Sequence, residues 1–153
     1  MSGGPEDPIP HAHSGEPRFE ILEHTADIGF RAWGRTPAEL FENAAHALMS
    51  IATDARDIGR TQQRDIAASG ADYESLMVNW LSEIVYAFDA GLFAPADFRV
   101  YEITPSALKA LWTGEPRDPR RHPWKLIVKA ITYHQIEVAE RAGRWQTTVF
   151  VDI

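Results

Sequence analysis

The alternation of hydrophobic and polar positions changes period along the chain, and it first predicts two short strands separated by a turn. Residues 18–23 (RFEILE) and 30–34 (FRAWG) have the length and the aromatic and β-branched content typical of strands. The segment EHTADIG connects them, and Gly29 and Gly34 interrupt the pattern. We therefore expect ordered structure to begin near residue 18.

Two further segments have the spacing of amphipathic helices. In the first, Thr36 is a suitable N-cap, Pro37 occupies the first helical position and Glu39 completes the sequence signature of a capping box. The second begins at Asp72 and ends at Gly91. We expect their apolar faces to form the core, not a cofactor site. These faces comprise Leu40, Phe41, Ala44, Leu48 and Ile51 in the first helix, and Leu76, Met77, Trp80, Leu81, Ile84, Val85 and Phe88 in the second.

Strand-like patterns dominate the rest of the chain, apart from a turn at 54–63 and a charged, proline-rich loop at 114–123. A hairpin turn with the sequence AGR precedes the last strand. Two helices among about six strands predict an α/β (α+β) fold. The expected form is a single-domain, two-layer sandwich whose mixed, mostly antiparallel sheet is packed by two helices. The predicted strands of this part are 64–69, 98–104, 107–114, 125–140 and 144–153.

The first 17 residues differ from the rest in composition. They are rich in glycine, proline and acidic residues, so residues 1–17 are expected to form a disordered N-terminal tail. Residues 18–153 are expected to form the folded domain. His11 and His13 in the tail could bind a metal ion, but two chance histidines in a solvated segment explain them better.

Charge and composition exclude several classes of function. The chain has 22 acidic and 15 basic residues, a net charge of −7, which argues against a general nucleic-acid binder. It has no cysteine, which excludes disulfides, thiolate metal sites and cysteine nucleophiles. We find neither an apolar run of membrane-spanning length nor a secretory signal pattern. A cytoplasmic protein is therefore expected.

Four groups of polar residues are candidates for chemistry, in HTADIG, in PRDPRRHP, in KAITYH and at the chain end. Taken singly, each has a structural explanation. An aspartate can cap a turn, a lone histidine is more often a core or rim residue, and an arginine-rich loop can be a solvated face. The candidates are His24 and Asp27; Asp118, Arg120, Arg121 and His122; Lys129 and His134; and Asp152 and Ile153.

Three carboxylates among these candidates suggest a cation site. Asp27, Asp152 and the free carboxylate of Ile153 are hard oxygen donors. If they converge, they repel one another unless a cation lies between them. Such a set suits calcium, magnesium or manganese, and suits zinc poorly. This hypothesis would explain why the predicted last strand runs to the final residue.

With these motifs in place, the chain resembles the archease family. The resemblance covers nearly all of residues 19–153 and rests on EHTADIGFRAWG, TPAELFENAAHAL, KAITYH and the closing FVDI, in that order. It implies a small α/β protein that assists the RtcB-type RNA ligase in tRNA splicing and RNA repair. That ligase joins RNA ends with a 2′,3′-cyclic phosphate or 3′-phosphate to 5′-hydroxyl ends. It first guanylylates its own histidine, with GTP and manganese.

The resemblance also implies roles for particular residues. The family's metal site is the aspartate of HTAD plus the C-terminal Asp-Ile pair, which correspond to Asp27, Asp152 and Ile153. Calcium is the expected cation, with magnesium and manganese as alternatives. The family also uses a basic residue near the loop before KAITYH, and the choice between Arg121 and Lys129 is open. The candidate contacts to a partner or to phosphate are His24, Arg121, His122, Lys129 and His134.

By this resemblance the protein is an activator and not itself an enzyme. It is expected to promote guanylylation and multiple turnover of the ligase, which would itself handle the RNA. One alternative is a chaperone or modulator of another RNA-processing enzyme, such as a methyltransferase. A metal-dependent phosphohydrolase is less favoured, because the sequence offers no clear nucleophile, no glycine-rich phosphate cradle and no second metal-ligand cluster of recognised spacing.

Overall fold

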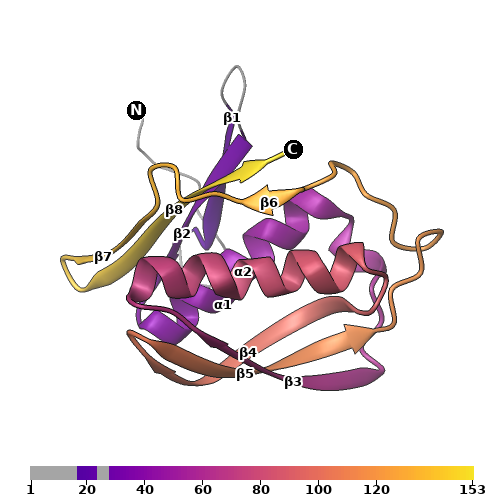
Figure 1. Ribbon diagram of the computed structural model, residues 1–153, viewed down its shortest axis with the longest axis horizontal. Helices are drawn as coiled ribbons and strands as arrows, with labels where there is room; N and C mark the ends of the chain where they lie inside the picture. Colours follow the sequence, from indigo (N-terminus) through magenta and orange to yellow (C-terminus); the bar gives the residue numbers. More distant parts are fainter. Residues whose placement is uncertain (1–16, 24–27) are drawn as a thin grey trace.

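The computed structural model describes residues 17–23 and 28–153, which form two sheets with two helices between them (Figure 1). The expected N-terminal tail therefore lies outside the described residues, except for its last one. The helices are α1 (Pro37–Ala52) and α2 (Tyr73–Asp89), with a short 3-10 helix η1 (Ala55–Asp57). The strands are β1 (Phe19–Glu23), β2 (Ile28–Gly34), β3 (Gln62–Ser69), β4 (Ala94–Thr104), β5 (Ala107–Glu115), β6 (Ala130–Ile131), β7 (Glu137–Arg141) and β8 (Arg144–Asp152).

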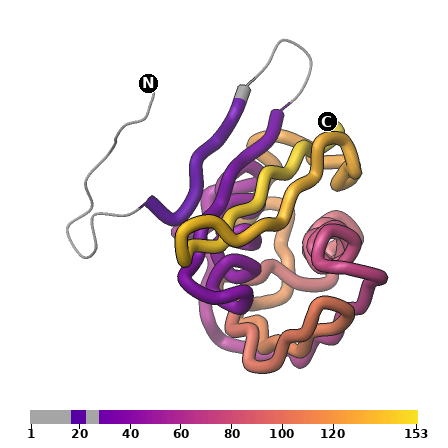
Figure 2. The backbone as a smooth tube through the Cα atoms, turned by 90° about the vertical axis from the view of Figure 1, so that its left-hand side faces the viewer, coloured from indigo at the N-terminus to yellow at the C-terminus, as the bar shows by residue number. Residues whose placement is uncertain are grey.

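All strand pairs of the described residues are antiparallel. The larger sheet has the order β1-β2-β8-β6, and β7 also pairs with β8; the smaller sheet has the order β3-β5-β4. Helix α1 contacts both β2 and β4, so it links the two sheets. Figure 2 shows the larger sheet above the smaller one, with helix α2 viewed nearly along its axis. The predicted α+β class is confirmed, although the strands divide between two sheets instead of forming one.

Both helices begin with side-chain caps, and only one has the reciprocal form. In α2, Asp72 Oδ1 accepts from the Ser75 amide at 2.8 Å and Ser75 Oγ accepts from the Asp72 amide at 3.1 Å. In α1, Thr36 Oγ1 accepts from the Glu39 amide. The Glu39 carboxylate, however, accepts from the amide of Arg35, not from that of Thr36. The predicted capping box of α1 is therefore wrong in one of its two hydrogen bonds, the one from the Thr36 amide to the Glu39 side chain. The Glu39 carboxylate turns to Arg35 instead, because the Arg35 guanidinium also binds it.

The apolar faces of the two helices form the core, as predicted. Trp80 is fully buried, and its indole N–H donates to the Phe41 carbonyl at 2.9 Å, which ties α2 to α1. Its ring meets Trp112 and Phe98 edge-on, which extends the core to β5 and β4. Burying each such side chain contributes about 1.5–3 kcal/mol. Neither helix in the described part of the chain is long and apolar enough to span a membrane.

The predicted long strand over residues 125–140 is wrong. Only β6 and β7 form there, and they pair with opposite ends of β8. A turn separates them, in which Gln135 has a φ of 53° and the Ile136 amide donates to the Tyr133 carbonyl. Before β6, the Lys125 amide bonds to the last residue of α1, Ala52, at 2.7 Å. The segment is thus held partly by a helix end, and its alternating pattern reflects burial without continuous strand pairing.

Candidate functional site

The C-terminal end of β8 is held in place by the segment around β6. Asp152 pairs with Ala130, and the Lys129 amide donates to the Asp152 carbonyl at 2.7 Å. Thr132 donates to the Phe150 carbonyl through both its amide and its hydroxyl, each at 3.1 Å. The backbone of the last strand is therefore fixed to its end, while the Asp152 side chain is exposed.

A hollow of about 330 Å³ lies beside this strand end. Its lining includes Thr132, His134, Phe150 and Asp152. The His134 ring lies 5.8 Å from the Phe150 ring, and the His134 amide donates to the Thr132 hydroxyl at 3.3 Å. The structure thus brings together His134 and Asp152, two residues that the sequence placed in different candidate groups. Lys129 adjoins Asp152 through its backbone.

Strand β2 supplies the other side of this strand end. Ile28 pairs with Val151, and Gly29 pairs with Phe150. A Cβ atom on Gly29 would lie 2.7 Å from the Phe150 ring and 2.5 Å from the Val149 carbonyl oxygen. The missing side chain at position 29 therefore allows the Phe150 ring to lie against the strand. This explains why the segment between the first two strands ends in a glycine.

The two candidate residues of the HTAD motif, His24 and Asp27, lie outside the described residues. Within the described part, no group of three or more His, Cys, Asp or Glu side chains is placed to hold a metal ion. Because Asp27 is one of the three expected ligands, this finding does not test the proposed set. The cation site stays a prediction.

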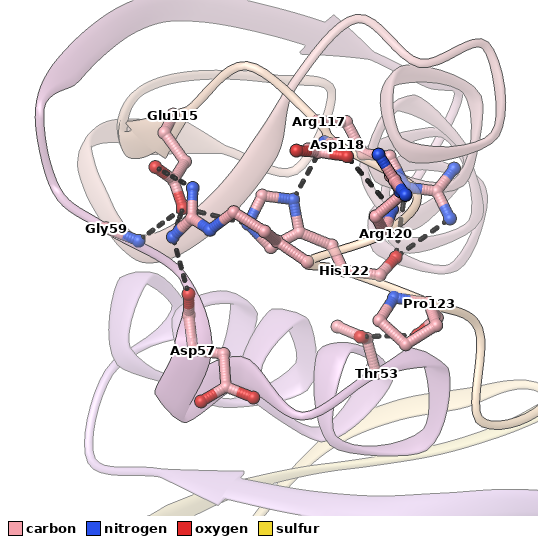
Figure 3. A network of polar contacts seen from close by, with 10 residues as sticks. Thr53, Asp57, Gly59, Glu115, Arg117, Asp118, Arg120, His122 and Pro123 are labelled. Carbon is pink, nitrogen blue, oxygen red and sulfur yellow. Dashed lines mark hydrogen bonds and ion pairs between the residues drawn. The ribbon is translucent and has the colours of Figure 1, made fainter.

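The arginine-rich loop folds around Glu115, the last residue of β5 (Figure 3). The carboxylate accepts from the Gly59 amide at 2.7 Å and from the Arg121 guanidinium at 2.9 Å. The Nε2 atom of His122 lies 2.8 Å from it. The Arg121 hydrogen bond, followed by those from Gly59 and His122, lowers the pKa of Glu115 to about 2. Glu115 is therefore ionised at neutral pH although its side chain is nearly buried.

Arg117 fastens the same loop to helix α2. Its guanidinium donates to the Phe88 carbonyl at 2.8 Å and twice to the His122 carbonyl, at 3.1 and 2.9 Å. The guanidinium also lies over the Phe88 ring, 4.0 Å from its centroid. Burial lowers the pKa of Arg117. These contacts are those of a structural support, in which one side chain binds two carbonyls and adds to the hydrogen bond that the Phe88 carbonyl accepts from the Gly91 amide.

This arrangement changes the interpretation of two predicted contacts. His122 has no exposed surface, and both of its ring nitrogens form hydrogen bonds within the protein. The prediction that His122 contacts a partner or phosphate directly is therefore wrong. Arg121 is about half exposed but bonded to Glu115 and to the Asp57 carbonyl. The loop is also more than a solvated face. Sequence reasoning missed Glu115; a charged residue closing an apolar strand, seven positions before His122, was the available signal.

The described residues thus define a small α+β protein whose central strand ends in an exposed acidic group beside a histidine-lined hollow. The family model of the archease protein family matches residues 19–153. The archease protein of Methanosarcina mazei is 41% identical over 140 residues, covering 89% of this chain and 96% of the relative. That of Pyrococcus furiosus is 37% identical over 140 residues, covering 89% and 99%. The chain belongs to the archease family.

Solved structures agree with this assignment. The solution structure of protein 1598 from Methanobacterium thermoautotrophicum has a TM-score of 0.75 and 29% sequence identity, and the match covers 89% of this chain and 99% of that one. The crystal structure of a Thermotoga maritima archease, described as a possible chaperone, has a TM-score of 0.61 at 21% identity, covering 94% and 100%. At that identity the second match supports the fold alone.

Proposed function

We propose that this protein is a cation-binding activator of an RtcB-type RNA ligase in tRNA splicing and RNA repair. It promotes guanylylation of the ligase and lets the ligase turn over repeatedly. The ligase handles the RNA, and this chain supplies no catalytic group. Membership of the archease family supports this proposal at the level of the whole chain.

The observation that carries the site is the register between β2 and β8. Ile28 pairs with Val151. Asp27 directly precedes Ile28 in the sequence, and Asp152 directly follows Val151. The two aspartates of the proposed cation site are therefore the sequence neighbours of two directly paired residues. This adjacency supports a shared site for Asp27, Asp152 and the Ile153 carboxylate.

The donor set decides which cation fits. Carboxylate oxygens without nitrogen or sulfur ligands suit calcium best, with magnesium and manganese as alternatives. A cation at the strand end would neutralise the acidic groups and leave coordination positions for oxygens of a partner. Such a metal position can stabilise charge on a phosphoryl group.

The structure also bears on which basic residue, Arg121 or Lys129, acts beside the proposed cation site. The Lys129 amide bonds to Asp152, so this lysine belongs to the strand end that carries the proposed site. The Arg121 guanidinium is bonded to Glu115 in another part of the fold. The geometry therefore supports Lys129 as the functional basic residue. His134, in the hollow with Asp152, is the histidine best placed to assist it.

The test is transfer of labelled GMP from GTP to a cognate ligase, with and without this protein. We expect faster guanylylation and more RNA joined per ligase molecule when the protein is present. An unchanged rate with a verified cognate ligase would contradict the proposal. The protein alone is expected to show no ligase, GTPase or phosphatase activity, and phosphoester hydrolysis by the purified chain would favour a hydrolase.

A chaperone or modulator of another RNA-processing enzyme is the second candidate. The Thermotoga maritima archease, which shares this fold, has been described as a possible chaperone. Affinity capture from lysate separates the two proposals: recovery of an RNA ligase supports activation, whereas recovery of a methyltransferase without the ligase supports the second.

A further inference from the structure

A second hollow lies at the turn between β7 and β8, at the opposite end of β8 from Asp152. It has a volume of about 440 Å³ and is lined by Arg35, Arg141, Ala142, Gly143, Arg144 and Gln146. Three of these six residues are arginines, in a chain with a net charge of −7. We call it the arginine hollow. Its distance from Asp152 along β8 is eight residues, or roughly 26 Å at about 3.3 Å per residue.

The strand register brings these arginines together. Arg141 and Arg144 are directly opposite each other across a two-residue turn, in which Ala142 has a φ of 54° and Gly143 a φ of 76°. Arg35 directly follows Gly34, the partner of Trp145 and thus of the residue after Arg144. Like charges directly opposite each other in an antiparallel pair destabilise a sheet. The register thus places two positive side chains at one turn, where a single anion could contact both.

Neighbouring side chains hold each guanidinium in place. Arg144 lies 5.1 Å from the centre of the Trp33 ring, and the Trp33 indole N–H is itself fixed by Gln146 at 3.0 Å. Arg141 donates to Glu137 at 2.6 Å, and Arg35 to Glu39 at 3.3 Å. Glu137 and Glu39 thus each bind one arginine of the hollow, whereas Arg144 lies over an aromatic ring. The Arg141 side chain is 63% exposed and remains accessible to solvent.

Guanidinium groups favour one chemical class of ligand. Each is a planar group of five N–H donors that binds two oxygens of a phosphate side by side. We propose that the arginine hollow binds the phosphate group of a ligand, chiefly through Arg141 and Arg144, with Arg35 on the third side. Glu137 and Glu39 orient the arginines and limit the affinity. This site is independent of the cation site and of ligase activation.

Amide NMR spectra of the ¹⁵N-labelled protein test the proposal directly. Inorganic pyrophosphate, titrated at matched ionic strength, should shift the signals of Gly143, Ala142 and the Gln146 side-chain amide. Arg141→Gln and Arg144→Gln should each weaken binding about tenfold, because each removes a charge-assisted bond. Arg56→Gln removes the same charge from η1, outside the hollow, and should leave the affinity unchanged. Glu137→Gln should strengthen binding.

The outcomes separate the site from a general charge effect and identify the source of the phosphate. Absence of pyrophosphate-specific shifts at the turn overturns the proposal, and so does equal weakening by Arg56→Gln and Arg141→Gln. Melting temperatures within a few degrees of the native protein show that the variants are folded. If a short single-stranded RNA shifts the same amide signals and binds more tightly than pyrophosphate, the phosphate ligand belongs to a nucleic-acid backbone. Weaker RNA binding identifies a small phosphate ester.

Discussion

The Nε2 atom of His122 lies 2.8 Å from Oε2 of Glu115, and the other ring nitrogen shows which group donates. The His122 Nδ1 accepts a hydrogen bond from the Asp118 amide at 2.9 Å, so Nδ1 carries no proton. The proton is on Nε2, and a neutral His122 donates to an ionised Glu115. One buried carboxylate thus organises the loop that follows it in the sequence, and its hydrogen bond from the Gly59 amide ties that loop to a distant part of the chain.

This network predicts a specific dependence of stability on pH. The pKa of Glu115 is lowered from 4.5 to about 2, so its contribution to stability is present above pH 4.5 and is lost as the pH falls toward 2. Glu115→Gln should therefore be less stable than the native protein at pH 7, and the difference should shrink below pH 4.5. Urea unfolding measured between pH 2 and pH 7 checks this.

The matched control for that experiment is Glu140→Gln, which removes an exposed carboxylate from β7. Its unfolding free energy should follow that of the native protein at every pH. If the curves of Glu115→Gln and the native protein stay parallel down to pH 2, the carboxylate does not hold the loop.

Arg117→Met should destabilise the fold by about 1–3 kcal/mol, because it leaves the carbonyls of Phe88 and His122 without this donor. Arg120→Met, at an exposed position of the same loop, should change stability by less than about 0.5 kcal/mol. Chemical denaturation of both variants provides the comparison. Equal stability of the two would show that the loop is not anchored by Arg117.

The helices could be predicted from local sequence signals, whereas the long-range contacts of the fold leave no such signal in the sequence. Thr36 and Asp72 cap the helices as expected, because caps and apolar faces are set by residues a few positions apart. The buried state of His122 depends on its hydrogen bond to Glu115, whose carboxylate is itself held by the amide of Gly59 from a distant part of the chain. The division into two sheets likewise depends on pairings between distant strands. The sequence singled out Asp152 and His134 but placed them in separate groups, because their shared hollow depends on the pairing of β6 with β8.

Asp27→Ala should abolish binding of calcium and of manganese while leaving the fold intact. The expected loss follows from removing one of three proposed oxygen ligands. Calorimetric titration of each cation into the native protein and the variant measures it. Asp65→Ala, on β3 of the other sheet, is the control and should bind as the native protein does. Equal cation binding by the native protein and Asp27→Ala would contradict the assigned ligand.

Extension of the chain beyond Ile153 should impair both cation binding and ligase activation. A peptide bond at this position replaces the charged carboxylate by a neutral amide and places new atoms beside Asp152, whose backbone is fixed by Lys129. Loss of a charge-assisted contact costs about 1.5–3 kcal/mol, or roughly a tenfold to hundredfold loss in affinity. A histidine tag after Ile153 should therefore weaken calcium binding in calorimetry, whereas the same tag before Met1 should not. Both tagged proteins are freed of bound metal before the titration. Melting temperatures without added cation should agree between the two proteins. If both bind calcium and stimulate guanylylation equally, the Ile153 carboxylate is not a ligand, and the site rests on the aspartates alone.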